Sequence, residues 1–169
     1  IRVQIGGSGV GSNQVSDNTT HTNGRDGIYV DSGNTGQVTV VADNVTFNNT
    51  FSGIYAERAE VRNNTAYGNQ SAGLFVTDSA LAIGNISHSN TVGIISGENS
   101  GSGFATVRNN TVYANVNAGI RANYASVIQN NVVHMSPVGI YAYDRFNGSV
   151  TGNVVYNINL VALDIDNNE

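Results

Sequence analysis

Residues 110–120 read Asn110-Thr111-Val112-Tyr113-Ala114-Asn115-Val116-Asn117-Ala118-Gly119-Ile120. The stretch holds an Asn, four residues, a second Asn, a short spacer and a Gly-Ile pair. That pair recurs, as Gly-Ile or Gly-Leu, at Gly27-Ile28, Gly53-Ile54, Gly73-Leu74, Gly93-Ile94, Gly119-Ile120 and Gly139-Ile140. The intervals are 26, 20, 20, 26 and 20 residues, and a degenerate pair, Ala162-Leu163, follows 23 residues later. Such a repeat indicates the architecture before any single helix or strand is considered.

Two columns of Asn accompany these pairs. The first stands eight or nine residues before each pair, at Asn18, Asn44, Asn64, Asn85, Asn110, Asn131 and Asn153. The second follows five residues later, at Asn23, Asn49, Asn69, Asn90 and Asn115, and continues as Ser136 and Ile158. Two coils leave an alternative open, because Gly84 or Asn130 could replace Asn85 or Asn131 and move His88 and His134 out of their column. We keep Asn131 because residues 131–134 mirror residues 153–156.

Composition and period together predict a β-solenoid with one coil per repeat. Asn, Gly, Thr and Val are poor helix formers, and no window shows a sustained period of 3.6 residues. An Asn at the same corner of every coil can bond the turn backbone and its neighbours above and below. Asn also tolerates the left-handed conformation that sharp corners demand, and Gly allows either a positive φ or a close approach.

The longer coils gain residues directly after the Gly-Ile strand, at 31–36, 97–103 and 144–148, with 6–12 at the equivalent point. We expect these loops to line one edge, where repeat proteins often bind partners.

The repeat resembles a known family. Asn-x-Val-x-x-Asn followed by Gly-Ile, as in residues 110–120 and 153–157, is similar to the right-handed parallel β-helix repeat. That repeat occurs in carbohydrate-binding and sugar-processing proteins such as mannuronan epimerases, pectate lyases and polygalacturonases, and in the accessory protein that matures the copper site of nitrous oxide reductase. The resemblance covers residues 15–166. It implies an all-β, single-stranded right-handed parallel β-helix of about seven to eight coils. We expect residues 1–169 to form one such module, excised from a longer protein because the chain begins at Ile1 without a signal-like segment.

Alternation along each strand separates core from surface. In the Gly-Ile strand the first and third positions should point inward and the second outward. The outward residues are then Tyr29, Tyr55, Phe75, Ile95, Arg121, Tyr141 and Asp164. In the Asn-led strand we place the second residue after Asn inside and the third outside, which gives His21, Phe47, Tyr67, His88, Tyr113, His134 and Tyr156.

These two columns hold eight of the 13 Tyr and Phe residues and all three His. One interpretation is that rings one coil apart stack and stiffen the sheet. A second is a polysaccharide platform, because flat rings beside amides suit the apolar faces and hydroxyls of sugars. A third is packing against another domain. The platform predicts the ligand-binding residues Tyr29, Tyr55, Phe75, Arg121, Tyr141, Tyr67, Tyr113 and Tyr156.

Catalytic and metal motifs are weak. His21, His88 and His134 lie too many coils apart to share an ion, so we expect no metal site. The one alternative is calcium, bound by acids near the insert corner, which are Asp26, Asp31, Glu57, Asp78, Glu98 and Asp144.

The chain lacks the Asp-Pro-His-Glu motif of mannuronan epimerases and the Gly-His-Gly of polygalacturonases. Pectate lyases use an Arg or Lys base, and Arg121 is the one position that suits it, although stacking on Tyr141 is the simpler interpretation. Arg58, Arg62, Arg108 and Arg145 are interpreted as solvated.

Charge and composition narrow the function classes. A net charge of −5 with no Lys disfavours nucleic-acid binding, no apolar run is long enough for membrane insertion, and the absence of Cys removes thiol chemistry. We therefore predict a non-catalytic, secreted or cell-surface module that binds polysaccharide and requires no cofactor. The alternatives are a structural unit of a stalk, adhesin or filament, and a divergent polysaccharide lyase or epimerase fragment. Open solenoid ends also favour end-to-end self-association or contact with neighbouring domains of the same chain.

Overall fold

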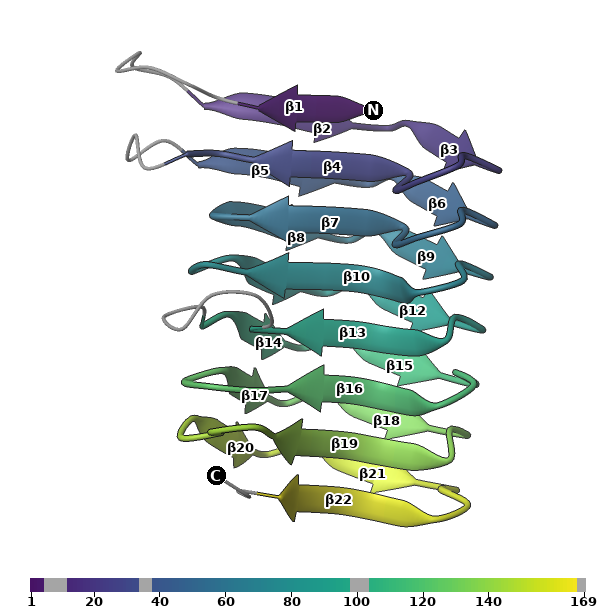
Figure 1. Cartoon of the computed structure of the whole chain (residues 1–169), viewed down its shortest axis with the longest axis vertical. Helices are drawn as coiled ribbons and strands as arrows, with labels where there is room; N and C mark the ends of the chain where they lie inside the picture. The colour runs from purple at the N-terminus through teal and green to yellow at the C-terminus, as the bar shows by residue number, and fades with distance from the viewer. Residues whose placement is uncertain (5–11, 34–37, 98–103, 167–169) are drawn as a thin grey trace.

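The computed structural model describes residues 1–4, 12–33, 38–97 and 104–166. These residues form a parallel β-solenoid of about seven turns, in which each turn adds one strand to each of three parallel sheets (Figure 1). The described residues contain no helix, and so no helical segment that could cross a membrane. The predicted all-β solenoid is confirmed.

Three sheets run the length of the molecule. The first contains, among the described residues, the strands β1 (Arg2–Gln4), β4 (Ile28–Asp31), β7 (Ile54–Glu57), β10 (Ala72–Thr77), β13 (Val92–Ser96), β16 (Ala118–Ala122), β19 (Val138–Tyr143) and β22 (Val161–Asp166). The second contains β2 (Asn13–Ser16), β5 (Thr39–Ala42), β8 (Ala59–Arg62), β11 (Leu81–Ile83), β14 (Thr106–Arg108), β17 (Val127–Gln129) and β20 (Ser149–Thr151). The third contains β3 (Thr19–His21), β6 (Val45–Phe47), β9 (Thr65–Tyr67), β12 (Ile86–His88), β15 (Thr111–Tyr113), β18 (Val132–His134) and β21 (Val154–Tyr156).

One expected insert loop lies entirely among the described residues, at the corner between the first and second sheets. Residues 144–148 join β19 to β20 at that corner. The other three expected loops fall mainly on residues 5–11, 34–37 and 98–103, which lie outside the described residues.

The first Asn column forms a continuous hydrogen-bonded ladder between the second and third sheets. In each coil the backbone N–H and the side-chain Nδ2 both donate to Oδ1 of the Asn one coil further along, at 2.8–3.0 Å. Asn85 and Asn131 both belong to it, which settles the alignment of their coils. The second column repeats this arrangement from Asn23 to Asn115, where the backbone N–H donates to the Ser136 hydroxyl at 3.2 Å.

The left-handed residues at these corners are not the ladder residues themselves. In every coil the residue immediately before the first-column Asn has a positive φ, and so does the residue before each second-column position. The first set is Asp17, Asp43, Asn63, Gly84, Asn109, Asn130 and Gly152. Our expectation that the ladder Asn adopts this conformation was wrong, because its side chain must point inward along the stack while its predecessor makes the bend.

The core follows the predicted alternation. Ile28, Ile54, Leu74, Ile94 and Ile120 are fully buried, and the position two residues after each is also buried. The expectation fails in the last described coil, where Leu163 is 47% and Ile165 is 52% exposed, because no described strand lies beyond β22.

The repeated Gly serves close approach rather than a special φ. A Cβ at Gly53 would lie 2.7 Å from the Gly73 carbonyl oxygen and 2.8 Å from Asn69 Nδ2, so the adjacent coil leaves no room for a side chain. The Gly of the Gly-Ile pair is therefore required by the spacing between coils.

We expect Gly53→Ala to lower the free energy of unfolding by about 3 kcal/mol, because backbone must shift to admit the methyl group. Gly24→Ala is the matched control, since nothing lies within 4 Å of its Cβ position. Urea denaturation of both variants provides the measurement. Equal stabilities would contradict the close-approach explanation.

Candidate functional site

The outward column of the third sheet is an unbroken stack of rings. It runs in the order His21, Phe47, Tyr67, His88, Tyr113, His134 and Tyr156, with neighbouring centroids 4.8–5.2 Å apart and ring planes within 14° of parallel. Burial lowers the pKa of His88 below its usual value, because the imidazolium would lose hydration inside the stack.

Stacking occupies the faces of these rings. Each inner ring is covered on both sides by its neighbours, so its edge and polar atoms are what remain toward solvent. Among the described residues, only His21 and Tyr156, the first and last members of the column, have a ring neighbour on one side alone. The predicted column exists, but its inner members Tyr67 and Tyr113 offer edges and hydroxyls rather than flat platforms.

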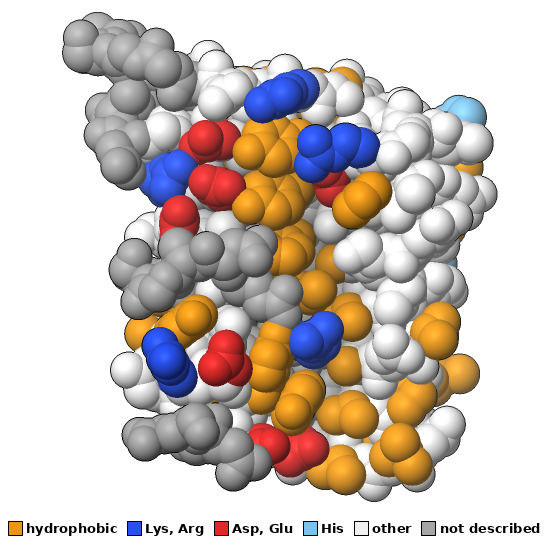
Figure 2. Space-filling model, in the orientation of Figure 1, with side chains coloured by type: hydrophobic (Ala, Val, Ile, Leu, Met, Phe, Trp, Pro, Cys, Tyr) orange, Lys and Arg blue, Asp and Glu red, His pale blue; other side chains and the backbone are white. Residues whose placement is uncertain are grey.

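The outer face of the first sheet carries the second predicted column, in the predicted register. Arg2, Tyr29, Tyr55, Phe75, Ile95, Arg121, Tyr141 and Asp164 are successive pairing partners. Tyr29 stacks on Tyr55 at 5.0 Å with ring planes 3° apart. Figure 2 shows this face, with a band of hydrophobic side chains and charged groups gathered beside it.

The middle of this column is closed to ligands. Phe75 is 8% and Ile95 is 5% exposed, and they form a small apolar cluster with Ala72, Val92 and Ala118. The interpretation of Phe75 as a solvent-facing binding residue is therefore corrected. It lies on the outer side of the sheet as predicted, but its ring is buried by apolar packing.

Arg121 stacks on a different ring from the one expected. Its guanidinium lies 4.8 Å from the centroid of Tyr143 and donates to the Tyr143 hydroxyl at 2.9 Å. Tyr143 in turn stacks on Tyr141 at 4.8 Å. Arg121 is thus held by aromatic contacts, and Tyr143 is a member of this group that the alternation rule did not single out.

Arg58 is the centre of a charged cluster at the corner after β7. Its guanidinium lies 2.6 Å from Asp31, 3.0 Å from Glu57 and 2.8 Å from Asp78, three of the acids that suggested calcium. Tyr55 donates to the other oxygen of Glu57 at 2.7 Å. The interpretation of Arg58 as a solvated residue is wrong, because its guanidinium forms ion pairs with these three carboxylates. Arg58 therefore occupies the place that the calcium hypothesis gave to a metal ion.

The cluster changes the ionisation of its members. Burial alone would raise the pKa of the Asp31 carboxyl, but the Gly33 N–H at 2.9 Å and the Arg58 guanidinium together hold that pKa below its usual value. Burial lowers the pKa of Arg58, yet the surrounding carboxylates more than offset it. The pKa of the Tyr29 hydroxyl is raised by burial and by the charges of Glu57 and Asp31.

The remaining acids of the calcium hypothesis do not join this cluster. Asp26 accepts the backbone N–H of Ser52 at 3.0 Å, Asp144 is exposed at its corner, and Glu98 lies outside the described residues. Among the described residues no group of three or more His, Asp or Glu side chains has the geometry of a metal site.

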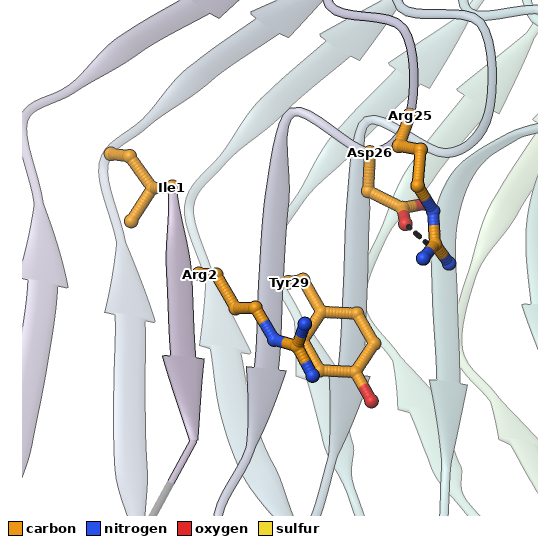
Figure 3. A pocket seen from close by; sticks show the side chains of 5 residues that line it. All are labelled: Ile1, Arg2, Arg25, Asp26 and Tyr29. Carbon is orange, nitrogen blue, oxygen red and sulfur yellow. Dashed lines mark ion pairs between the residues drawn. The ribbon is translucent and has the colours of Figure 1, made fainter.

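A pocket of about 270 Å³ lies at the first coils, lined by Ile1, Arg2, Arg25, Asp26 and Tyr29 (Figure 3). The Arg2 guanidinium covers the Tyr29 ring at 5.1 Å, and Arg25 lies 3.9 Å from Asp26. The Arg25 guanidinium also lies 5.8 Å from the centroid of the Phe51 ring, so the two cations of the pocket contact different rings. The sequence did not single out Arg2 and Arg25 as site residues, and it did not predict the contacts of Arg58. An alignment of whole coils could have found the latter, because it places Arg58 beside the three acids that it contacts.

Comparisons with known proteins agree with this geometry. Residues 2–105 match the family model described as right handed beta helix region. The Azotobacter vinelandii mannuronan C-5 epimerase AlgE4 A-module is structurally similar, with a TM-score of 0.71 and 21% identity over 92% of this chain and 54% of that chain. The AlgE6 A-module of the same organism gives a TM-score of 0.67 and 21% identity over 92% of this chain and 53% of that one. No curated protein matches the sequence. The chain spans about half the length of these modules, and at this identity the likeness shows the fold alone.

We expect Arg58→Met to lower the free energy of unfolding at pH 7 by about 2 kcal/mol, because it leaves three carboxylates without their cation. The loss should shrink below about pH 4, since a carboxyl with a lowered folded-state pKa stabilises the fold above its unfolded pKa and loses that contribution as the pH falls. Urea denaturation of the variant and the natural chain at pH 7 and at pH 3 measures the loss of stability at each pH. The exposed Arg108→Met is the control. A loss that is equal at both pH values would contradict this role.

Proposed function

The chain belongs to the right-handed β-helix family, and from this premise we propose that it is a non-catalytic module that binds polysaccharide on the outer face of its first sheet. The proposed binding region comprises the Arg2–Arg25–Tyr29 pocket and the adjoining Tyr55 and Glu57 side chains. The observation that carries the proposal is this pocket, where Arg2 covers the Tyr29 ring and Arg25 lines the same cavity on an otherwise regular surface.

The chemistry of the region suits a sugar polymer. The pocket volume of about 270 Å³ is just below the usual range for ligand pockets, which fits one unit of a longer chain. Arg25 donates hydrogen bonds to hydroxyl, carboxylate or sulfate oxygens, and the carboxylates beside Tyr55 accept them from hydroxyls. Binding thus relies on ring edges and polar groups, because stacking covers the ring faces. A secreted or cell-surface setting accompanies this proposal, because extended polysaccharides are found there.

A non-catalytic role is supported by the sequence. The Asp-Pro-His-Glu stretch that the resemblance to epimerases would require is missing, and Arg121 is engaged by Tyr143. The alternative of a divergent lyase or epimerase fragment rests on the structural likeness to epimerase modules, and product analysis separates the two.

A structural role is the second candidate, and the seven-ring stack favours it. Rings that cover one another over the whole length of the third sheet stiffen the solenoid without needing a ligand. Under this alternative the molecule serves as a unit of a stalk, adhesin or filament.

Affinity electrophoresis with alginate, pectate and neutral glucans tests the proposal. We expect at least one polymer to retard the protein, and the double variant Arg2→Gln with Arg25→Gln to weaken retention about tenfold, because charge-assisted hydrogen bonds are lost. Arg108→Gln, on the second sheet, is the matched control. Unchanged melting temperatures would show that the pair acts in binding.

Retention that is equal in the double variant and the control would contradict the proposed site. No retention by any polymer, together with a lower melting temperature on Tyr29→Ala, would favour the structural role. Unsaturated or epimerised products after incubation would favour the enzyme.

A further inference from the structure

The outer face of the third sheet has a pattern that repeats every two coils. The strands β9, β12, β15 and β18 lie one above another (Figure 1), and each turns its first and third side chains outward. The outward pairs, in coil order, are Thr65 with Tyr67, Ile86 with His88, Thr111 with Tyr113, and Val132 with His134. A coil that presents two hydroxyls therefore alternates with a coil that presents an aliphatic side chain and an imidazole.

The length of this two-coil repeat follows from the ring stack. The ring centroids of Tyr67 and His88 are 5.2 Å apart, and those of His88 and Tyr113 are 4.8 Å apart. The same two distances recur from Tyr113 to His134 and from His134 to Tyr156. Neighbouring ring planes in this part of the stack stay within 12° of parallel, so the sheet has little twist here. Equivalent groups therefore recur along a straight column at about 10 Å.

The polar atoms of these side chains are left for a partner outside the protein. The hydroxyls of Tyr67 and Tyr113 are partly exposed and make no hydrogen bond with the described residues. His88 Nδ1 lies 3.1 Å from the Ser89 hydroxyl, which leaves Nε2 as the ring nitrogen that can bond elsewhere. Each coil thus offers one external hydrogen-bonding group at the aromatic position.

The same face carries no formal charge. The strands of the third sheet contain no Asp, Glu or Arg, and the chain has no Lys. Burial lowers the pKa of His88, which favours the neutral imidazole at pH 7. The residue before the ladder Asn is also uncharged in these four coils, where it is Asn63, Gly84, Asn109 or Asn130. A carboxylated or sulfated ligand would find no cation on this face, so the chemistry favours a neutral one.

An extended β-1,4-linked hexopyranose chain has a matching repeat. Successive units of such a chain are turned over relative to each other, so the same edge of the sugar recurs at every second unit. Each unit advances the chain by close to one strand spacing. One edge can then meet every Thr-Tyr coil while the opposite edge meets every aliphatic-His coil. Chains with β-1,3 or α-1,4 linkages wind into open helices and do not stay in step with the coils.

We propose that the middle coils of the third sheet bind a neutral, extended β-1,4-linked polysaccharide, with its axis along the solenoid and one sugar unit at each coil. The sugar hydroxyls bond the tyrosine hydroxyls and the histidine Nε2 atoms edge-on, because stacking covers the ring faces. This binding face is separate from the Arg2–Arg25–Tyr29 pocket on the first sheet, and the inference does not depend on that pocket.

Affinity electrophoresis with three neutral polymers tests the linkage. Glucomannan carries the β-1,4 linkage, laminarin the β-1,3 linkage and soluble starch the α-1,4 linkage. We expect glucomannan to retard the natural chain and the other two to leave its mobility unchanged. Glucomannan that fails to retard the chain, or laminarin or starch that retards it equally, would overturn the inference.

Hydroxyl deletions test the position of the polymer. The double variant Tyr67→Phe with Tyr113→Phe keeps both rings in the stack and should weaken retention by glucomannan about tenfold, because two hydrogen bonds are lost. Tyr124→Phe, between β16 and β17, is the matched control and should change nothing. Equal melting temperatures would show that the stack is intact. Equal retention of the double variant and the control would overturn the proposal.

The two binding faces are separable in the same assay. Arg2→Gln with Arg25→Gln should leave retention by glucomannan unchanged, whereas the double Phe variant should leave any retention by alginate or pectate unchanged. Alginate and pectate therefore report on the first-sheet pocket, and glucomannan reports on the third sheet. Loss of glucomannan retention in the Arg variant but not in the Phe variant would place the neutral polymer on the first sheet and overturn this inference.

Discussion

The side-chain ladder of asparagines is the interaction on which the rest of the structure depends. Each buried amide accepts two hydrogen bonds from one neighbouring coil and donates to the other, so a coil that slips by one residue loses all of them. Because an unpaired buried polar group costs about 1–3 kcal/mol, the ladder fixes the register of every coil. The larger length differences between coils then fall between the strands of the first and second sheets, whereas the distance in sequence from the ladder Asn to the following Gly varies by one residue only.

That fixed register is what creates the surface features. Identical positions lie about one strand spacing apart, so rings stack on rings and the corner acids converge on Arg58. The same regularity covers the aromatic faces within the stacks. Distinctive chemistry consequently arises where the regular pattern is interrupted, as at the Arg2–Arg25–Tyr29 pocket.

The repeat made most of the fold predictable, because one alignment of Asn and Gly-Ile positions determines strand pairing for every coil, including those of Asn85 and Asn131. What the alignment could not supply were features that depend on packing between columns. The burial of Phe75 requires an apolar cluster on the outer face, and the choice of Tyr143 over Tyr141 as the partner of Arg121 depends on side-chain reach. The left-handed residue before each Asn follows from which way the amide must point, which one-dimensional spacing does not encode.

The most direct test of this account is the stability of Asn85→Ala, which removes one rung from the middle of the ladder. Asn64 would lose the acceptor of its backbone N–H, at 2.9 Å, and of its Nδ2, at 3.0 Å. Equilibrium denaturation should show a loss of at least about 2 kcal/mol relative to the exposed Asn117→Ala. If the two variants unfold within about 0.5 kcal/mol of each other, a range typical of neutral surface substitutions, the ladder does not hold the coils in register.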